Sequence, residues 1–329
     1  MAWTRGVCAG ADGAPRTGCE RRPLTVASLS PRDIYSRVKD GDGIRFRTGP
    51  FSVRLTTTLP ECIDPWRHAY GALHILEDDE PSHFRVHVCH GHGARRWIAR
   101  QSHFVCDGQV PFEPYPASHA FPLFEWGLNW CIAHMAQYFL LLHSAVVEKN
   151  GHAAILPAAP GSGKSTLCAG LVARGWRLLS DEFGILRHDD GMLLPMPRPV
   201  PLKNASIDVM QKFAPHLSFG PRYEKTRKGT VVHLFPPEDS LRRQAEPARP
   251  RWVIFPRFQQ GAPLCLTPQP ETLAIARLVN NAFNYPVTGE DGFRSLCRLV
   301  RDVDAFDLVN GDLNEAVECI DGLAAAEAA

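Results

Sequence analysis

The chain has 329 residues, of which 44% are hydrophobic, so it can bury a sizeable core and has room for two domains. Its formal net charge is only +1, which argues against bulk electrostatic attraction to nucleic acid or to a membrane surface. The ten cysteines never fall in Cys-x-x-Cys spacing, and several lie in apolar stretches, as small buried hydrophobic residues do. We therefore expect reduced thiols in a cytoplasmic protein, with neither nucleic acid nor membrane as a partner.

Two segments resemble targeting or membrane sequences only superficially. Residues 1–22 are rich in Gly, Ala and Arg and have no apolar run, so they predict a disordered lead-in and not a secretory signal. Residues 126–142 are apolar, but they number seventeen, fewer than the roughly twenty that a membrane-spanning helix needs. Three polar residues also interrupt them: Asn129, His134 and Gln137. We expect a buried helix that leads into a strand at His143.

The chain changes character near residue 120. Residues 23–120 consist of short strand-like runs, which predict a β-rich N-terminal domain. Within it, 44–46 and 51–55 flank a Gly-Pro turn and predict a hairpin with one apolar face. The proline-rich segment 111–122 is typical of a linker. Residues 123–329 alternate helical and strand patterns, so we expect an α/β nucleotide-binding domain there.

A glycine-rich loop is the most informative feature of that second half. Residues 151–157 predict a buried strand, and 164–174 predict a helix that ends at Gly175. A strand, a glycine-rich loop with Lys-Ser and a helix form the context of a phosphate-binding loop. The usual first glycine is Ala158 here, and the alternative is an unremarkable loop before an ordinary helix. The residues expected to bind nucleotide in this loop are Ala158, Ala159, Pro160, Gly161, Ser162, Gly163, Lys164, Ser165 and Thr166.

The chemistry expected of this loop is phosphate binding. Gly161 and Gly163 permit backbone angles that turn several N–H groups toward one point, where a helix N-terminus adds a partial charge of about +0.5. Lys164 would reach the β- and γ-phosphates of ATP, and the Ser165 hydroxyl would ligate Mg²⁺. The cofactors expected are therefore ATP and Mg²⁺.

Two carboxylates follow the next predicted strand, residues 176–180. Ligands of open α/β sheets bind at strand ends, so Asp181 and Glu182 are expected to face the phosphates. One carboxylate would hold Mg²⁺, and the other could take a proton from an attacking hydroxyl. The alternative is a solvated acidic pair at the start of a loop.

The remaining candidates are basic or polar residues further along the chain. Arg227 and Lys228 could clamp phosphate groups or an acidic peptide, or they could belong to a solvated basic loop. Lys203 and Asn204 follow two prolines and could form a positioned polar pair or a surface turn. Three amphipathic helices and a strand are predicted beyond them, at 270–282, 291–301, 313–323 and 305–309 respectively.

The region around the loop resembles HPr kinase/phosphorylase, the bacterial serine kinase of the phosphocarrier protein HPr. That family has a His-Gly-Val-Leu-Val-Asp segment before its phosphate loop, and this chain has His-Ser-Ala-Val-Val-Glu at 143–148. The family's helix ends in Arg-Gly-His and its next strand in Asp-Asp, where this chain has Arg-Gly-Trp at 174–176 and Asp-Glu at 181–182. The resemblance covers residues 140 to 210. It implies a P-loop core of the HPr kinase type in an α/β fold, with a smaller β-rich domain before it.

The resemblance also implies roles for individual residues. Asp181 would be the catalytic acid or base, His143 would line the active site with Lys164, and Glu182 would support the metal. The family's next signature, with its Glu and Arg, is replaced here by residues 199–206, which leaves the reverse, phosphorolytic activity open. The motifs at 203–207 and 226–230 are more similar to the HPr-kinase-related proteins of the kinase A type.

We therefore expect an ATP-dependent kinase that acts on a hydroxyl, with serine or threonine of a peptide or small protein as the acceptor. One alternative is a kinase for a small-molecule hydroxyl. The other is a nucleotide-gated binding protein with little transfer, which would need a metal ligand but no base at Asp181. Ring assembly in the resembled family makes a homo-oligomer plausible.

Overall fold

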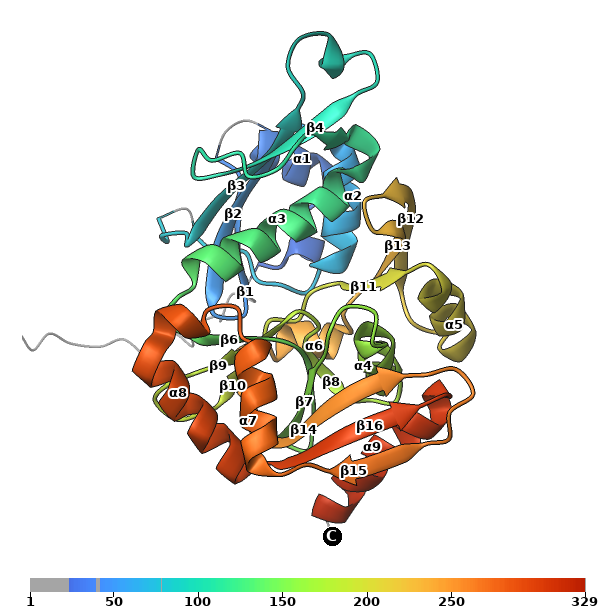
Figure 1. The fold of residues 1–329 in the computed structure, drawn as a ribbon. Helices are drawn as coiled ribbons and strands as arrows, with labels where there is room; N and C mark the ends of the chain where they lie inside the picture. Colours follow the sequence, from blue (N-terminus) through green and yellow to red (C-terminus); the bar gives the residue numbers. More distant parts are fainter. Residues whose placement is uncertain (1–23, 40–41, 78, 329) are drawn as a thin grey trace, which may run out of the picture.

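The structure is a computed structural model, and it describes residues 24–39, 42–77 and 79–328. The expected lead-in, residues 1–22, lies outside the described residues. The chain forms an N-terminal part and a C-terminal part stacked on each other, each with its own sheet (Figure 1). In the described part of the chain, no helix combines the length and the hydrophobicity that a membrane crossing needs.

The N-terminal part is a five-stranded sheet in the order β1-β2-β3-β4-β5. The β2–β3 pair is parallel and the other pairs are antiparallel. The predicted hairpin is confirmed, because Thr48 of β1 pairs with Phe51 of β2 across a two-residue turn. Its strands are β1 (Ile44–Thr48), β2 (Phe51–Thr57), β3 (Phe84–His90), β4 (Gln101–Cys106) and β5 (Tyr115–Pro116).

Three helices complete this part: α1 (Pro31–Lys39), α2 (Pro60–Ala69) and α3 (Ala120–Met135). The proline-rich segment 111–122 is not a free linker, because it contributes β5 and the first turn of α3. Pro122 lies in that turn, where a missing N–H costs no helical hydrogen bond. The buried residues of α3 join the core of the N-terminal sheet, so residues 123–135 pack with the N-terminal part.

The expected helix over 126–142 is only partly correct. The helix ends at Met135, and Leu140–Leu142 already belong to β6 (Leu140–Lys149). These leucines pair with β9 (Phe183–Leu186). A short buried apolar run can form its backbone hydrogen bonds in a sheet as well as in a helix, so its sequence pattern does not distinguish the two.

The C-terminal part contains an eight-stranded mixed sheet in the order β10-β9-β6-β7-β14-β16-β15, with β8 also paired to β6 (Figure 1). This arrangement confirms the expected α/β class. The β7–β14 and β14–β16 pairs are parallel and the others antiparallel. Its remaining strands are β7 (His152–Pro157), β8 (Arg177–Ser180), β10 (Leu193–Leu194), β14 (Arg249–Phe258), β15 (Cys265–Pro268) and β16 (Asp304–Asn310).

Helices cover both faces of this sheet. On one face, α4 (Lys164–Ala173) packs against α9 (Leu313–Ala328). On the other, α7 (Glu271–Asn280) packs with α8 (Tyr285–Asp302), as the helical patterns predicted. The short α6 (Glu238–Arg242) lies against β8.

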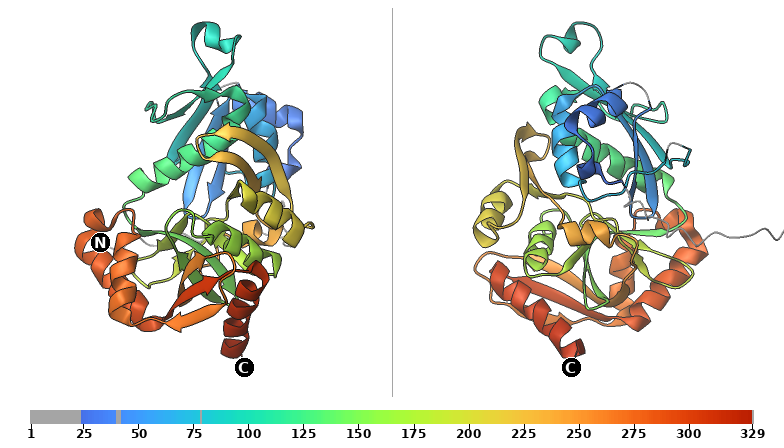
Figure 2. Two further views of the ribbon diagram at one scale, coloured as in Figure 1. Left: turned by 45° about the vertical axis from the view of Figure 1, so that its right-hand side comes forward. Right: turned by 180° about the vertical axis from the view of Figure 1, so that it is seen from behind.

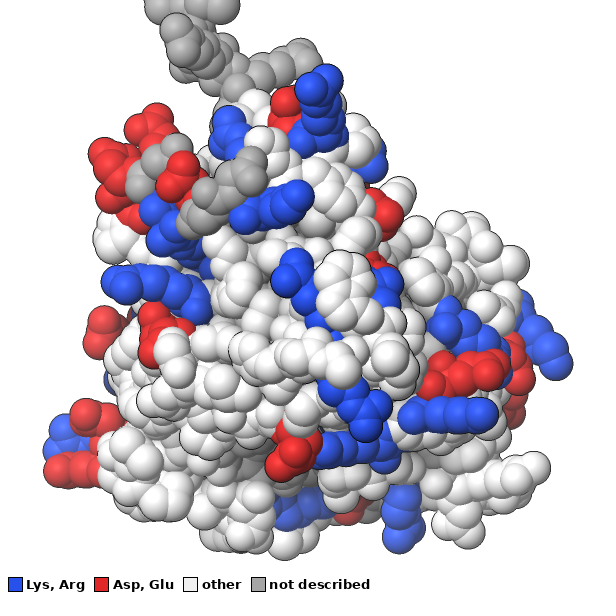
Figure 3. Space-filling model, turned by 90° about the horizontal axis from the view of Figure 1, so that it is seen from above, with Lys and Arg blue, Asp and Glu red and all other residues white. Residues whose placement is uncertain are grey.

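A third, three-stranded antiparallel sheet connects the two parts. It is ordered β11-β13-β12, with strands β11 (Val200–Lys203), β12 (Phe219–Thr226) and β13 (Gly229–Leu234). The β12–β13 hairpin rises from the C-terminal part beside α2, and α5 (Ala205–Phe213) follows β11 (Figure 2). Viewed from above, lysine and arginine side chains are interspersed with acidic ones over the surface (Figure 3).

Candidate active site

The direction of three strands brings the candidate residues together. Both β7 and β8 are antiparallel to β6, which lies between them, so β7 and β8 run in the same direction. The loop that follows β7 and the acids that follow β8 therefore emerge at the same level of the sheet. Pro157, the last residue of β7, pairs with Ser144 of β6. Two residues further along β6, Val146 pairs with Ser180, the last residue of β8.

Asp181 and Glu182 follow Ser180, the last residue of β8, as the sequence predicted. They form a two-residue interruption, because β9 begins at Phe183 and pairs with β6 as β8 does. Ser180 Oγ holds this interruption by accepting hydrogen bonds from the N–H of Phe183 at 3.1 Å and of Glu182 at 3.4 Å. Two carboxylates are thereby placed within the sheet beside the glycine-rich loop.

The loop itself has the backbone that the glycines predicted. Gly161 and Gly163 adopt φ of +86° and +90°, in the region that favours glycine. Gly163 is the N-cap of α4, and a Cβ atom there would lie 2.9 Å from the Cβ of Phe258. The Ser162 carbonyl accepts a hydrogen bond from the Phe258 N–H at 2.9 Å. The end of β14 thus supports the loop, while Ala159 and Pro160 remain exposed. Gly175 has φ of +88° and ends the helix as expected.

Lys164 is buried, with 8% of its surface exposed. Its Nζ donates a hydrogen bond to the backbone carbonyl of Asp181 at 2.8 Å, across the gap between α4 and the strand interruption. This bond fixes the position of the ammonium at the helix N-terminus, next to the N–H groups that an anion would contact.

Ser165 and Asp181 are directly joined. Ser165 Oγ donates to Asp181 Oδ2 at 2.8 Å, whereas Asp181 Oδ1 is buried and has no hydrogen-bond partner among the residues that the structure describes. Burial is the main cause that raises the pKa of Asp181 to about 6; the Glu182 charge adds to the rise, and Lys164 and the Ser165 hydrogen bond oppose it. A buried carboxylate with one free oxygen and a raised pKa can accept a proton or a cation. The adjacent Thr166 is half-buried on the first turn of α4.

Glu182 has a different environment. Its Oε2 lies 3.7 Å from Nε2 of His143, and 27% of its side chain is exposed. Burial opposes ionisation, but His143 and the ammonium of Lys164 outweigh it and lower the pKa of Glu182 to about 2. The backbone N–H of His143 donates to the Asn281 carbonyl at 2.6 Å, and the imidazole ring packs against Phe283. His143 therefore lies at the site, where it contacts Glu182.

The candidate metal ligands are only partly assembled. The described residues contain no group of three or more His, Cys, Asp or Glu side chains suited to a metal ion. Mg²⁺ usually takes one or two protein ligands and completes its shell with phosphates and water. The Ser165–Asp181 pair with its unpartnered oxygen fits such a site, and Glu182 faces His143 instead.

The basic residues of the β12–β13 turn lie over aromatic rings of the N-terminal part. The Arg227 guanidinium lies 5.0 Å from the ring centre of Tyr115, and Lys228 Nζ lies 5.7 Å from that of Trp126. Loss of solvation and the nearby Lys203 lower the pKa of Lys228. Arg227 and Lys228 are exposed, as in a surface turn, and the charges of Glu182 and Lys164 act on the pKa of Lys228, so the turn lies near the acids.

Asn204 has a structural role. It adopts φ of +51°, and its Oδ1 accepts a hydrogen bond from the Thr230 N–H at 3.1 Å. Its backbone N–H donates to the Thr230 carbonyl at 3.0 Å, so it joins β11 to β13. Lys203 lies closer to the acids, since its charge lowers the pKa of both Asp181 and Glu182.

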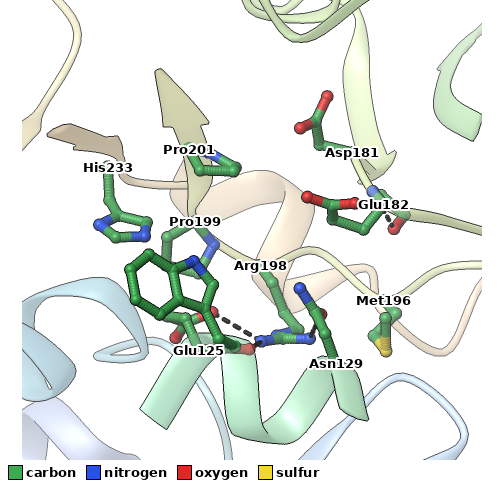
Figure 4. A pocket seen from close by; sticks show the side chains of 11 residues that line it. Glu125, Asn129, Asp181, Glu182, Met196, Arg198, Pro199, Pro201 and His233 are labelled. Carbon is green, nitrogen blue, oxygen red and sulfur yellow. Dashed lines mark hydrogen bonds and ion pairs between the residues drawn. The ribbon is translucent and has the colours of Figure 1, made fainter. Parts of the chain in front are cut away.

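Sequence reasoning missed a buried polar network beside the acids. Arg198 pairs with Glu125 Oε2 at 2.7 Å and donates to Tyr70 Oη at 3.3 Å and to Asn129. Glu125 and Asn129 belong to α3 (Figure 4) and Tyr70 is the C-cap of α2, so the network joins the two parts of the chain. The available signal was the Pro-Arg-Pro run at 197–199, which fixes the backbone on both sides of the arginine.

We compared the chain with protein-family models and with curated proteins, and neither search found a match.

Proposed function

We propose that the protein is an ATP-dependent kinase that transfers the γ-phosphoryl group to a hydroxyl, with serine or threonine of a peptide or small protein as acceptor. The observation that carries the proposal is the Ser165–Asp181 hydrogen bond, which links the first turn after the glycine-rich loop to a buried carboxylate with a free oxygen. Phosphoryl transfer needs this combination of phosphate cradle, metal ligand and base.

The finer fold assignment belongs to the same proposal. The loop from Ala158 to Gly163 and helix α4 would form a P-loop core of the HPr kinase type, as the resemblance at residues 143–148 and 174–182 implies. Backbone N–H groups of the loop and Lys164 would bind the phosphates of ATP.

The roles of the two Asp181 oxygens follow from their surroundings. Oδ2, next to Ser165 Oγ, would hold Mg²⁺ together with that hydroxyl, and Oδ1 would take the acceptor proton. Mg²⁺, when bound, would neutralise charge on the β- and γ-phosphates. Glu182, kept ionised by His143, would orient water around the metal site, and His143 would hold Glu182 in place.

Nucleotide binding is tested by calorimetry with MgATP. We expect the wild-type chain to bind, and Lys164→Ala to lose most of the affinity while remaining folded. Lys212→Ala is the matched control, because Lys212 is an exposed lysine on α5, outside the glycine-rich loop. Absence of binding by the wild type at millimolar MgATP would refute the proposal.

Transfer is tested with γ-labelled ATP and a degenerate serine/threonine peptide library. Asp181→Asn should keep nucleotide binding and slow transfer by on the order of 10² or more. Nucleotide binding with no transfer by the wild type would instead favour a nucleotide-gated binding protein.

A further inference from the structure

The order of the strands places the acids and the end of β14 on opposite sides of the glycine-rich loop. The loop follows β7; β6, with its partner β8, lies on one side of β7, and β14 lies on the other. Because β7, β14 and β16 are parallel, all three end at the edge of the sheet where the loop begins. Ligands of open α/β sheets bind at this edge. It continues past the loop over β14 and β16, away from Asp181 and Glu182.

Phe258, the last residue of β14, is fixed against the loop from two sides. Its backbone N–H donates to the Ser162 carbonyl at 2.9 Å. On the other side it pairs with Asn310 of β16, and the N–H of Gln259 donates to the Asn310 carbonyl at 2.9 Å. A Cβ atom on Gly163 would lie 2.9 Å from Phe258 Cβ and 3.9 Å from Cγ, where the ring begins. The ring is thus attached directly beside the N-terminus of α4.

The side chain of Phe258 is exposed at the end of a strand that is otherwise buried along its centre. Residues 252–256 of β14 are buried, whereas Phe258 is 50% exposed. A single exposed phenylalanine is common on protein surfaces, so exposure by itself indicates no ligand. This ring, however, adjoins a loop whose backbone suits phosphate binding, and an exposed aromatic face can stack a nucleobase.

The first turn of α4 determines the direction that a bound triphosphate would take. Lys164 Nζ and Ser165 Oγ both donate hydrogen bonds to Asp181, so the metal and the γ-phosphate of the proposed reaction belong on the acid side of the loop. A nucleoside triphosphate carries its nucleoside at the opposite end of the phosphate chain. With its phosphates along the loop, the nucleotide would therefore place its base on the side of β14, where the Phe258 ring is exposed.

We propose that Phe258 is the platform on which the adenine ring of ATP stacks. The proposal rests on the proposed kinase function and adds a binding residue for the nucleoside, which the glycine-rich loop alone does not supply. The end of β14 then makes two separate contacts: its backbone supports the loop, and its ring contacts the base. Because the backbone of Phe258 is held on both sides, the platform is in place before the nucleotide binds.

The test measures the binding of MgATP and of magnesium tripolyphosphate to the wild type and to Phe258→Ala by calorimetry. Tripolyphosphate has a three-phosphate chain and no base. Alanine keeps the backbone N–H and the Cβ atom that contact the loop and removes only the ring. We expect the Kd for MgATP to rise about tenfold, as the loss of one stacked base predicts, and the Kd for tripolyphosphate to stay unchanged. Phe258→Trp keeps an aromatic face and should bind MgATP at least as tightly as the wild type.

Phe293→Ala is the matched control. Phe293 is also 50% exposed, but it lies on α8, outside the loop and the end of β14. Its replacement should leave both dissociation constants unchanged. If Phe258→Ala does not fold, Phe258→Leu supplies a second test, because leucine fills much of the same space without an aromatic face. It should also weaken MgATP binding and leave tripolyphosphate binding unchanged.

The outcomes separate this proposal from the proposed function. Equal MgATP affinity in the wild type and Phe258→Ala would refute the base platform while the kinase assignment stands. A parallel loss of affinity for MgATP and tripolyphosphate would also refute it, because Phe258 would then act through the loop and not through the base. A wild type that binds neither ligand would refute the kinase assignment, and the platform with it.

Discussion

The buried Asp181 carboxylate predicts a measurable cost to stability in the absence of ligand. Its pKa rises from an ordinary 3.8 to about 6, mainly through burial. Since a tenfold change in an acid constant corresponds to about 1.4 kcal/mol, ionised Asp181 lowers the free energy of unfolding by about 3 kcal/mol. The folded state binds the proton more tightly than the unfolded state, so stability falls as the pH rises from about 4 through about 6.

Asp181→Asn removes this charge and keeps an oxygen for Ser165 Oγ. We expect the variant to be more stable than the wild type by up to about 3 kcal/mol at pH 8 and by about half of that at pH 5. Urea denaturation followed by circular dichroism at both pH values measures the difference. MgATP should stabilise the wild type and reduce the gap, because a bound cation compensates the carboxylate.

Asp190→Asn serves as the control, because its expected effect on stability has the opposite sign. The hydrogen bond from Arg187 lowers the pKa of Asp190 to about 2, so its ionised form stabilises the folded state. The exposed Arg187–Asp190 ion pair contributes little to the free energy of unfolding, so its loss should destabilise the protein only slightly at pH 8. If Asp181→Asn were neutral or destabilising at pH 8, or if its gain did not shrink at pH 5, the burial argument would be wrong.

Three further predictions follow from the same contacts. The kcat/KM for transfer should rise with pH through an apparent pKa of about 6, as Asp181 of the free enzyme deprotonates; a flat profile from pH 5 to 8 would contradict its role as base. Arg198→Ala should destabilise the chain by about 3–5 kcal/mol in denaturation experiments, because it leaves Glu125 charged and buried, and adding Glu125→Gln should recover part of the loss. Changing Arg227 and Lys228 to alanine should impair transfer more than MgATP binding. A wild-type transfer rate in that double variant would show that the β12–β13 turn has no role in transfer.

Local features of the site could be predicted from the sequence because they depend on neighbouring residues. The apolar run before the loop, Gly161 and Gly163 at positive φ and the cap at Gly175 all follow from backbone preferences over a few residues. The β1–β2 hairpin follows for the same reason, since its turn is two residues long. The proximity of Ser165 and Asp181 could also be predicted, because the two residues are only sixteen positions apart in the sequence.

Only the tertiary structure decided how distant segments combine. The path of β6 between β7 and β8 sets the level at which Asp181 meets the loop, and no local pattern encodes strand order. The same holds for the Glu125–Arg198 ion pair, whose residues are 73 positions apart in the sequence and meet where α3 contacts the segment that leads into β11. A family resemblance assigned His143 to the site. Its contact with Glu182 depends on the pairing of β6 with β9, which places His143 opposite Phe183, the residue after Glu182. Burial has the same origin: a carboxylate acquires a raised pKa only when packing removes water, and packing is a property of the whole chain.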